Sequence, residues 1–186
     1  MDRKNFLCTT FIGSTMIAGL ATRSKEFPVY NKKRKKRDLL KKHIRKTIMG
    51  IAHKVEYQNG TVSSDEHVQL IEYTARDVSE KFYYYLHNGR LRIGVTQKLI
   101  NLYLKFLWCA KLIKQPPHCP IDGFVRDIVR LEYNWISSDC IDDYKKAINA
   151  LEVFRAKKSY KSLSELELIE YNREYNHRNS FQIIHY

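Results

Sequence analysis

The chain contains few residues that break regular structure. Its 186 residues include only 4 Pro and 7 Gly, beside 13 Tyr, 8 Phe and 2 Trp. Few turn formers and many large apolar residues favour packed helices over a turn-rich β-sandwich, and they exclude collagen and wholesale disorder. The sequence also lacks internal repeats and strand-length alternation, so we predict one compact all-α domain over residues 1–186.

Cysteine is scarce as well. The 4 cysteines stand at positions 8, 109, 119 and 140, with no CxxC pair and no Cys/His cluster at zinc spacing. The sequence therefore signals neither a zinc site nor an iron–sulfur cluster, and we expect no metal and no cofactor. Free thiols fit a cytoplasmic protein best.

Long apolar runs are also missing. Residues 6–21 are apolar enough to resemble a signal peptide, but Thr9, Thr10, Ser14 and Thr15 interrupt them. The stretch is too short and too polar to span a bilayer. We expect a retained N-terminal helix packed on the core, and removal of residues 1–21 is the alternative.

Acidic residues are too few to balance the basic ones. There are 20 Asp and Glu against 33 Lys and Arg, which leaves a formal net charge of +13 at pH 7. Such a surplus opposes compaction and is best neutralised by a polyanion, either nucleic acid or an anionic membrane surface. Acidic substrates form a third class of partner.

The positive charge is concentrated in residues 32–46, where ten of fifteen residues are Lys or Arg. The run leads into Ile48 and Ile51, so we predict a basic helix. We expect its cations to contact phosphates, the alternative being a solvated face or a flexible arm. The cations assigned to this role are Lys32, Lys33, Arg34, Lys35, Lys36 and Arg37.

We divide the chain into three parts. Residues 1–56 hold the apolar and basic helices, residues 57–175 form a helical core, and residues 176–186 are a tail. We predict helices in the core over residues 65–86, 97–114, 124–133, 141–156 and from 162 onward. Thr96 would cap the second of these helices, and Pro116 would end it.

The predicted helix over residues 97–114 carries a polar stripe. Lys98, Asn101 and Lys105 recur at i, i+3 and i+7 in an otherwise apolar segment, so they share one face. We expect this face to line a cleft or to meet solvent.

Residues 94–104 read Gly-Val-Thr-Gln-Lys-Leu-Ile-Asn-Leu-Tyr-Leu. This segment resembles the helix-hairpin-helix signature of DNA glycosylases, L-P-G-V-G-x-K-T-A-N-x-x-L. The matching positions are held by Gly94, Val95, Lys98, Asn101 and Leu104. Thr96 replaces the second glycine and Ile93 replaces the proline. The resemblance covers about residues 89–130 and implies a helix-hairpin-helix element within the all-α fold.

The same resemblance assigns roles to individual residues. Asp122, in a segment similar to the superfamily's apolar-Asp segment, would be the carboxylate that stabilises the sugar cation, and Lys98 would be a Schiff-base nucleophile with lyase activity. Backbone N–H groups of residues 94–96 would hold a phosphate of double-stranded DNA, and Arg90 and Arg92 would clamp its neighbours. Asn101 and Lys105 would also face the DNA.

A glycosylase must hold the flipped base in a pocket. The residues that we assign to this pocket are Trp108, His118, Phe124 and Trp135. Tyr83, Tyr84 and Tyr85 are further candidates for stacking, although aromatic residues at such spacings belong more often to the core.

Two functions from different classes follow. The first is a DNA glycosylase that acts in repair or in defence against phage, and the alternative is a basic helical DNA- or RNA-binding protein without catalysis. A membrane-surface or toxin-like protein is a third interpretation, which the threonines in residues 6–21 disfavour. The target base, the lyase step and the oligomeric state stay open.

Overall fold

The all-α prediction is confirmed by the computed structural model, which describes residues 2–22, 24–35 and 37–179. Over these ranges the chain forms eight α-helices and no strand, and an isolated bridge joins Tyr30 to Leu86. The helices are α1 (Arg3–Leu20), α2 (Asp38–Ala52), α3 (Val55–Asn59), α4 (Ser64–Phe82), α5 (Ile93–Cys109), α6 (Gly123–Val129), α7 (Ile141–Lys157) and α8 (Leu163–Asn179). Two short 3-10 helices, η1 (Tyr83–Tyr85) and η2 (His87–Gly89), lie between α4 and α5.

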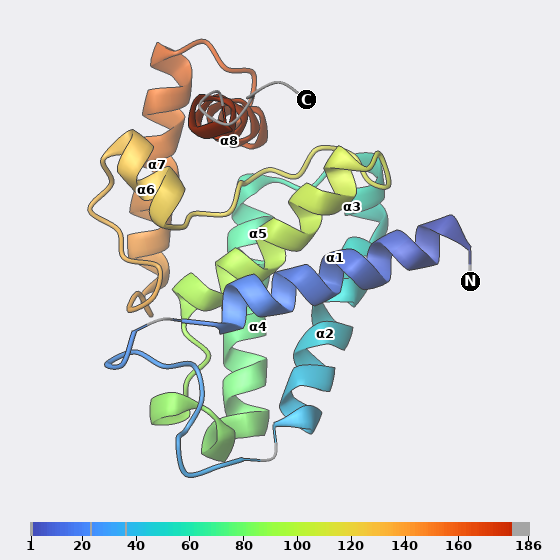
Figure 1. Ribbon diagram of the computed structural model, residues 1–186, viewed down its shortest axis with the longest axis vertical. Helices are drawn as coiled ribbons and strands as arrows, with labels where there is room; N and C mark the ends of the chain where they lie inside the picture. The colour runs from blue at the N-terminus through green and yellow to red at the C-terminus, as the bar shows by residue number, and fades with distance from the viewer. Residues whose placement is uncertain (1, 23, 36, 180–186) are drawn as a thin grey trace.

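Helix α1 lies across α5, with α4 and α2 beside them (Figure 1). Asp2 caps its first turn, and the Phe11 ring stacks on Phe106 with centroids 5.4 Å apart. Gly19 lets Leu99 approach, because a Cβ at Gly19 would lie 2.4 Å from Leu99 Cδ2. The predicted N-terminal helix thus packs on the core. Among the described residues, no helix has the length and apolarity needed to span a bilayer.

The basic segment is helical only in its second part. Helix α2 begins at Asp38, whereas residues 32–35 lie in the preceding loop. Within α2 the buried positions Leu40, Ile44 and Ile48 recur every fourth residue, so this stripe packs inward and the cations between them point outward. The prediction of one basic helix from residue 32 is therefore wrong for its first turn and a half.

Helix α4 begins at Ser64, one residue earlier than predicted, and Ser63 forms its N-cap. Ser63 Oγ accepts the Glu66 N–H, and Glu66 Oε2 accepts the Ser63 N–H, which completes a capping box. The short helix α3 precedes it and ends at Asn59, with Gly60 as its C-cap at a φ of 72°. Helix α4 ends at Phe82 rather than near residue 86.

Helix α5 also begins earlier than predicted, at Ile93. Its first N–H groups are satisfied from a distant loop, since Ile93 N–H donates to Asp139 Oδ1 and Gly94 N–H donates to the Ser138 carbonyl. Thr96 consequently lies inside the first turn and caps nothing. The helix-hairpin-helix element is not confirmed, because residues 83–92 join α4 to α5 through two 3-10 turns.

Helices α6, α7 and α8 gather on one side of the molecule (Figure 1). Tyr144 and Leu151 of α7 are fully buried in the core. Ser162 Oγ accepts the Glu165 N–H at the start of α8. The helix continues to Asn179, so residues 176–179 are helical rather than part of a tail.

Candidate functional site

Lys98 and Asp122 lie side by side. Lys98 Nζ is 3.3 Å from Asp122 Oδ2, and it lies 4.1 Å from the centre of the Trp135 ring. The Lys98 side chain is 12% exposed and the Asp122 side chain is 30% exposed. Three predicted site residues are therefore brought together at the rim of the core, where solvent reaches the carboxylate.

Two hydrogen bonds between the Gln97 side chain and the Ile121 backbone bring Lys98 and Asp122 together. Gln97 Nε2 donates to the Ile121 carbonyl at 2.6 Å, and Gln97 Oε1 accepts the Ile121 N–H at 3.1 Å. Lys98 follows Gln97 and Asp122 follows Ile121 in the chain, so these two hydrogen bonds place Lys98 and Asp122 next to each other. Asp122 Oδ1 also accepts the N–H groups of Phe124 and Val125, which makes it the N-cap of α6.

In the structure, Lys98 is already paired with Asp122 and packed against the Trp135 ring. Schiff-base chemistry needs an unprotonated amine at the sugar, so a bound substrate would have to separate Lys98 from both Asp122 and Trp135. Asp122 has one oxygen on the ion pair and the other on the helix N-terminus. Neither group is poised for attack before a substrate displaces these contacts.

The backbone around Gly94 does not form the predicted phosphate cradle. Gly94 N–H donates a hydrogen bond to the Ser138 carbonyl at 3.0 Å, and Thr96 N–H donates one to the Arg92 carbonyl at 2.9 Å. Gly94, Val95 and Thr96 are all buried. A Cβ on Gly94 would lie 2.0 Å from the Trp135 carbonyl oxygen, so the chain itself fills the space that a phosphate would need.

The two arginines predicted as clamps are also occupied. Arg90 Nε and Nη2 bond both carboxylate oxygens of Asp139, at 2.9 and 3.3 Å. Arg92 is buried and donates to the carbonyls of Phe27, Pro28 and Ile136. Burial lowers the pKa of Arg92. Arg92 therefore holds the loop at Phe27 and Pro28 against the core and is not free to contact DNA.

Asn101 and His118 belong to a buried polar network. Asn101 Oδ1 lies 2.6 Å from His67 Nε2, and Asn101 Nδ2 donates to the Tyr144 hydroxyl at 3.1 Å and to the Cys119 carbonyl at 3.0 Å. His118 Nδ1 lies 2.8 Å from the same Tyr144 hydroxyl. The predictions that Asn101 faces DNA and that His118 lines a base pocket disagree with this placement.

The network fixes the position of the proton on His118. Because Asn101 Nδ2 donates to Tyr144, the Tyr144 proton must go to His118 Nδ1, and a neutral His118 then carries its proton on Nε2. That Nε2 lies 2.8 Å from Ser64 Oγ, which is exposed. Ser64 consequently accepts a hydrogen bond from His118 and is not activated as a nucleophile, although the spacing suits a Ser-His pair.

Both histidines are held neutral. Burial lowers the pKa of His67 to about 4. Burial, together with the nearby His67, lowers the pKa of His118 to about 2. Sequence reasoning missed Gln97, His67 and Tyr144 as members of this cluster. The one available signal was an amide at positions 97 and 101 of an apolar helix, since two such residues one turn apart must pair inside the core.

The remaining predicted residues of α5 and its neighbours are scattered. Lys105 Nζ pairs with Glu167 at 2.6 Å and lies 4.7 Å from the centre of the Tyr171 ring. Trp108 is half-buried near the far end of α5, ten residues after Lys98. The Phe124 ring packs edge to face on Tyr171. Of the predicted base pocket, only Trp135 lies against Lys98.

The exposed cations of residues 32–46 form a surface that we call the basic surface. Its members are Lys32, Lys33, Arg34 and Lys35 in the loop and Lys41, Lys42, Arg45 and Lys46 on α2, all exposed. Within the described part of the chain, no carboxylate forms an ion pair with any of them. Arg37 instead lies over the Tyr30 ring at 4.3 Å. Lys36 lies outside the described residues.

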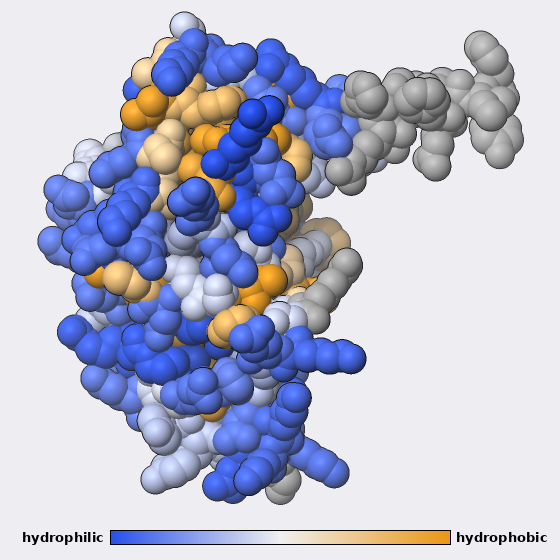
Figure 2. Space-filling view, turned by 90° about the vertical axis from the view of Figure 1, so that its left-hand side faces the viewer, coloured by the Kyte–Doolittle hydropathy of each residue, from blue (hydrophilic) through white to orange (hydrophobic). Residues whose placement is uncertain are grey.

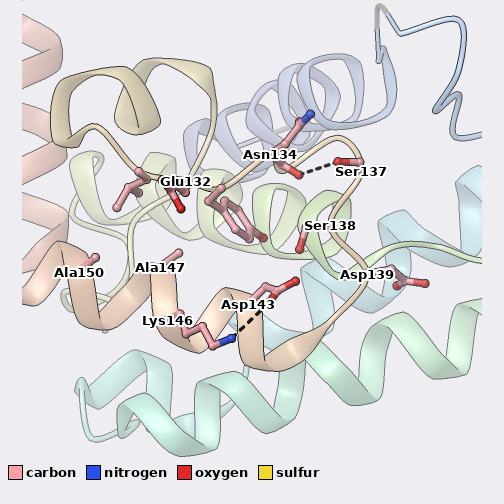
Figure 3. A pocket seen from close by; sticks show the side chains of 11 residues that line it. Glu132, Asn134, Ser137, Ser138, Asp139, Asp143, Lys146, Ala147 and Ala150 are labelled. Atoms are coloured by element: carbon pink, nitrogen blue, oxygen red, sulfur yellow. Dashed lines mark hydrogen bonds and ion pairs between the residues drawn. The ribbon is translucent and has the colours of Figure 1, made fainter.

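A cavity of about 480 Å³ opens between the 131–139 loop and α7 (Figure 3). Glu132, Asp139 and Asp143 line it, and Lys146 Nζ forms an ion pair with Asp143 Oδ1 at 3.8 Å. Neither Lys98 nor Asp122 lines it. Its carboxylates would repel phosphate. The described residues contain no group of three or more His, Cys, Asp or Glu side chains able to hold a metal ion.

Comparison with known proteins gives no relative. No protein-family model, no curated protein and no solved structure matches the chain.

Proposed function

We propose that this chain binds nucleic acid through the basic surface. The observation that carries the proposal is the contrast between this surface and the cations of the predicted site around α5. Lys98, Lys105 and Arg90 are each paired with a carboxylate. The eight cations of the basic surface have no such partner among the described residues, so their charge is available to phosphates.

The arrangement of the cations suits a polyanion. Lys41 and Arg45, like Lys42 and Lys46, stand four residues apart, so they form two adjacent rows on the outer face of α2. The loop cations at residues 32–35 precede this helix in the chain. Long hydrophilic side chains cover the end of the molecule at the bottom of Figure 2, where this loop lies (Figure 1). Several phosphates of one strand can therefore be neutralised at once.

The test compares two variants that lose equal charge. In the first, Lys41, Lys42, Arg45 and Lys46 are changed to Gln. In the control, the exposed α7 and post-α7 residues Lys145, Lys146, Lys157 and Lys158 are changed to Gln. Fluorescence anisotropy with an oligonucleotide of about 20 nucleotides should show a roughly 10- to 100-fold weaker Kd for the first variant and a much smaller change for the control. Equal losses would contradict the proposal, because they would reflect net charge alone.

A second candidate function is base excision, and the Lys98–Asp122 pair supports it. In this hypothesis Lys98 first loses its proton and then attacks C1′ of an extruded nucleotide. The C1′–N glycosidic bond breaks, its electron pair leaves with the base, and the base takes up a proton. Asp122 stabilises the positive charge on the deoxyribose, with Trp135 beside the pair. Burial of the predicted phosphate cradle argues against it. The hypothesis requires that a duplex with a modified base opens the ion pair.

Base excision has its own test. Base release from duplexes that carry modified bases should disappear in Asp122→Asn while DNA binding persists. Borohydride should trap a covalent adduct with the unaltered chain and none with Lys98→Gln. If the unaltered chain releases no base from any duplex tried, the binding function stands without catalysis.

A further inference from the structure

Two tyrosine rings stand exposed beside the basic surface. Tyr83 is 58% exposed and Tyr84 is 69% exposed. Both lie in η1, and their rings meet edge to face with centroids 5.5 Å apart. Aromatic rings of this size are normally buried, because each contributes a large apolar area to a core. An exposed pair therefore has a surface free to contact something else.

Hydrogen bonds fix this pair next to the loop cations. Asn31 N–H donates to the Tyr85 carbonyl at 2.9 Å, and Asn31 Nδ2 donates to the Tyr84 carbonyl at 3.3 Å. On the other side, His87 N–H donates to the Val29 carbonyl at 3.0 Å. Lys32 follows Asn31 directly, so the loop cations begin where the tyrosines are anchored.

Gly89 determines how the two rings differ. A Cβ at Gly89 would lie 2.1 Å from Tyr83 Cε2, so the Tyr83 ring rests on the glycine and uses that side for packing. Gly89 also has a φ of 69°, which disfavours any other residue. Tyr84 has no comparable contact with a glycine and is the more exposed of the two. It is the ring best placed to receive a planar ligand.

From this juxtaposition we propose that Tyr84, supported by Tyr83, stacks on an unpaired base of a single strand whose phosphates lie on the basic surface. The inference rests on the proposed nucleic-acid binding and names the form of nucleic acid. Proteins that bind single strands combine a positive track for the backbone with aromatic rings for the bases. Bases of a duplex are already stacked on each other and offer no face to Tyr84, so this surface prefers single strands.

The experiment measures the Kd of a mixed-sequence single strand and of its duplex. Tyr84→Ala should weaken single-strand binding by about 5- to 150-fold and change duplex binding by less than about twofold. Tyr84→Phe should bind single strands nearly as well as the unaltered chain, because the ring remains. Tyr73→Ala is the matched control, since Tyr73 is 56% exposed on α4 and away from η1.

The outcomes separate the two proposals. Unchanged single-strand binding in Tyr84→Ala, or equal losses for single strand and duplex, would overturn the stacking site. If the basic-surface variant still loses affinity in that case, the proposed function survives alone. Failure of the unaltered chain to bind any oligonucleotide would overturn both proposals. Tyr84-dependent binding to vesicles of phosphatidylserine, with none to single strands, would also overturn them in favour of a membrane surface.

Discussion

The side chain of Gln97 pairs with the backbone of Ile121 through two hydrogen bonds, one donated and one accepted. This pair joins the start of α5 to the loop before α6, and it accounts for the contact between Lys98 and Asp122. It also shows how a polar residue inside an apolar helix can fix a loop that contains no regular structure.

Replacement of Gln97 by Leu should therefore destabilise the protein. The change leaves the N–H and carbonyl of Ile121 buried without partners, and the expected loss is about 3 kcal/mol in the free energy of unfolding. Urea denaturation measures it. Gln69→Leu, at an exposed position of α4, should change stability by less than about 0.5 kcal/mol. Similar losses of unfolding free energy in the two variants would contradict a stabilising role for the hydrogen bonds between Gln97 and Ile121.

Acid should unfold the protein through His67 and His118. Their folded pKa values of about 4 and about 2 lie below the ordinary 6.5, so below pH 6.5 the unfolded chain binds more protons. Stability is complete above pH 6.5 and falls with pH, by about 2.7 kcal/mol per pH unit where both histidines contribute. Urea denaturation at a series of pH values gives this slope.

Two variants check the source of the slope. His118→Gln should reduce it by about half, because one titrating group is lost. His53→Gln should leave it unchanged, since His53 is exposed at the end of α2. A slope that His118→Gln does not reduce would show that carboxylates, and not the buried histidines, dominate the acid response.

Two helical glycines should respond to alanine in opposite directions. Gly94→Ala forces a methyl group against the Trp135 carbonyl and should cost more than about 2 kcal/mol. Gly13→Ala, where nothing lies within 4 Å of the added carbon, should stabilise α1 by about 0.5–1 kcal/mol. Thermal unfolding compares them. A neutral Gly94→Ala would mean that the loop at Trp135 does not pack against α5.

Asp122 combines an ion pair with a helix cap, and substitutions separate the two. Asp122→Asn keeps a good cap and loses the charge, so stability should fall by less than about 1 kcal/mol. Asp122→Ala loses the cap as well and should cost about 1 kcal/mol more. Chemical denaturation of both variants measures the difference, and equal effects would contradict the capping role.

Much of the fold could be predicted from periodicity. In the predicted helix over residues 65–86, the apolar residues at 68, 71, 75, 78, 82 and 86 step by three or four, which predicts one buried stripe. The first four are buried on α4, whereas Phe82 is half-buried and Leu86 lies beyond the helix. Asp122 stands just before the predicted helix over residues 124–133, a common position for a capping Asp, and it caps α6. Such features are local, because spacing along one helix and the first-turn N–H groups depend on neighbouring residues alone.

The surroundings of the candidate site could not be predicted in the same way. Arg92 looks like a surface cation in the sequence, but carbonyls from residues 27, 28 and 136 compensate its burial. The early start of α5 depends on Ser138 and Asp139, which lie more than 40 residues away. Partners that come from distant segments leave no periodic signal in the chain.

The basic surface is tested most directly by the salt dependence of nucleic-acid binding. Between about 50 and 200 mM salt, log Kobs for the unaltered chain should fall steeply and linearly with log salt, as expected when phosphates release counterions. The Gln variant of Lys41, Lys42, Arg45 and Lys46 should reduce the slope by about 2–4, whereas the α7 control should keep it. A flat response in the unaltered chain, or one slope for all three proteins, would contradict phosphate binding at this surface.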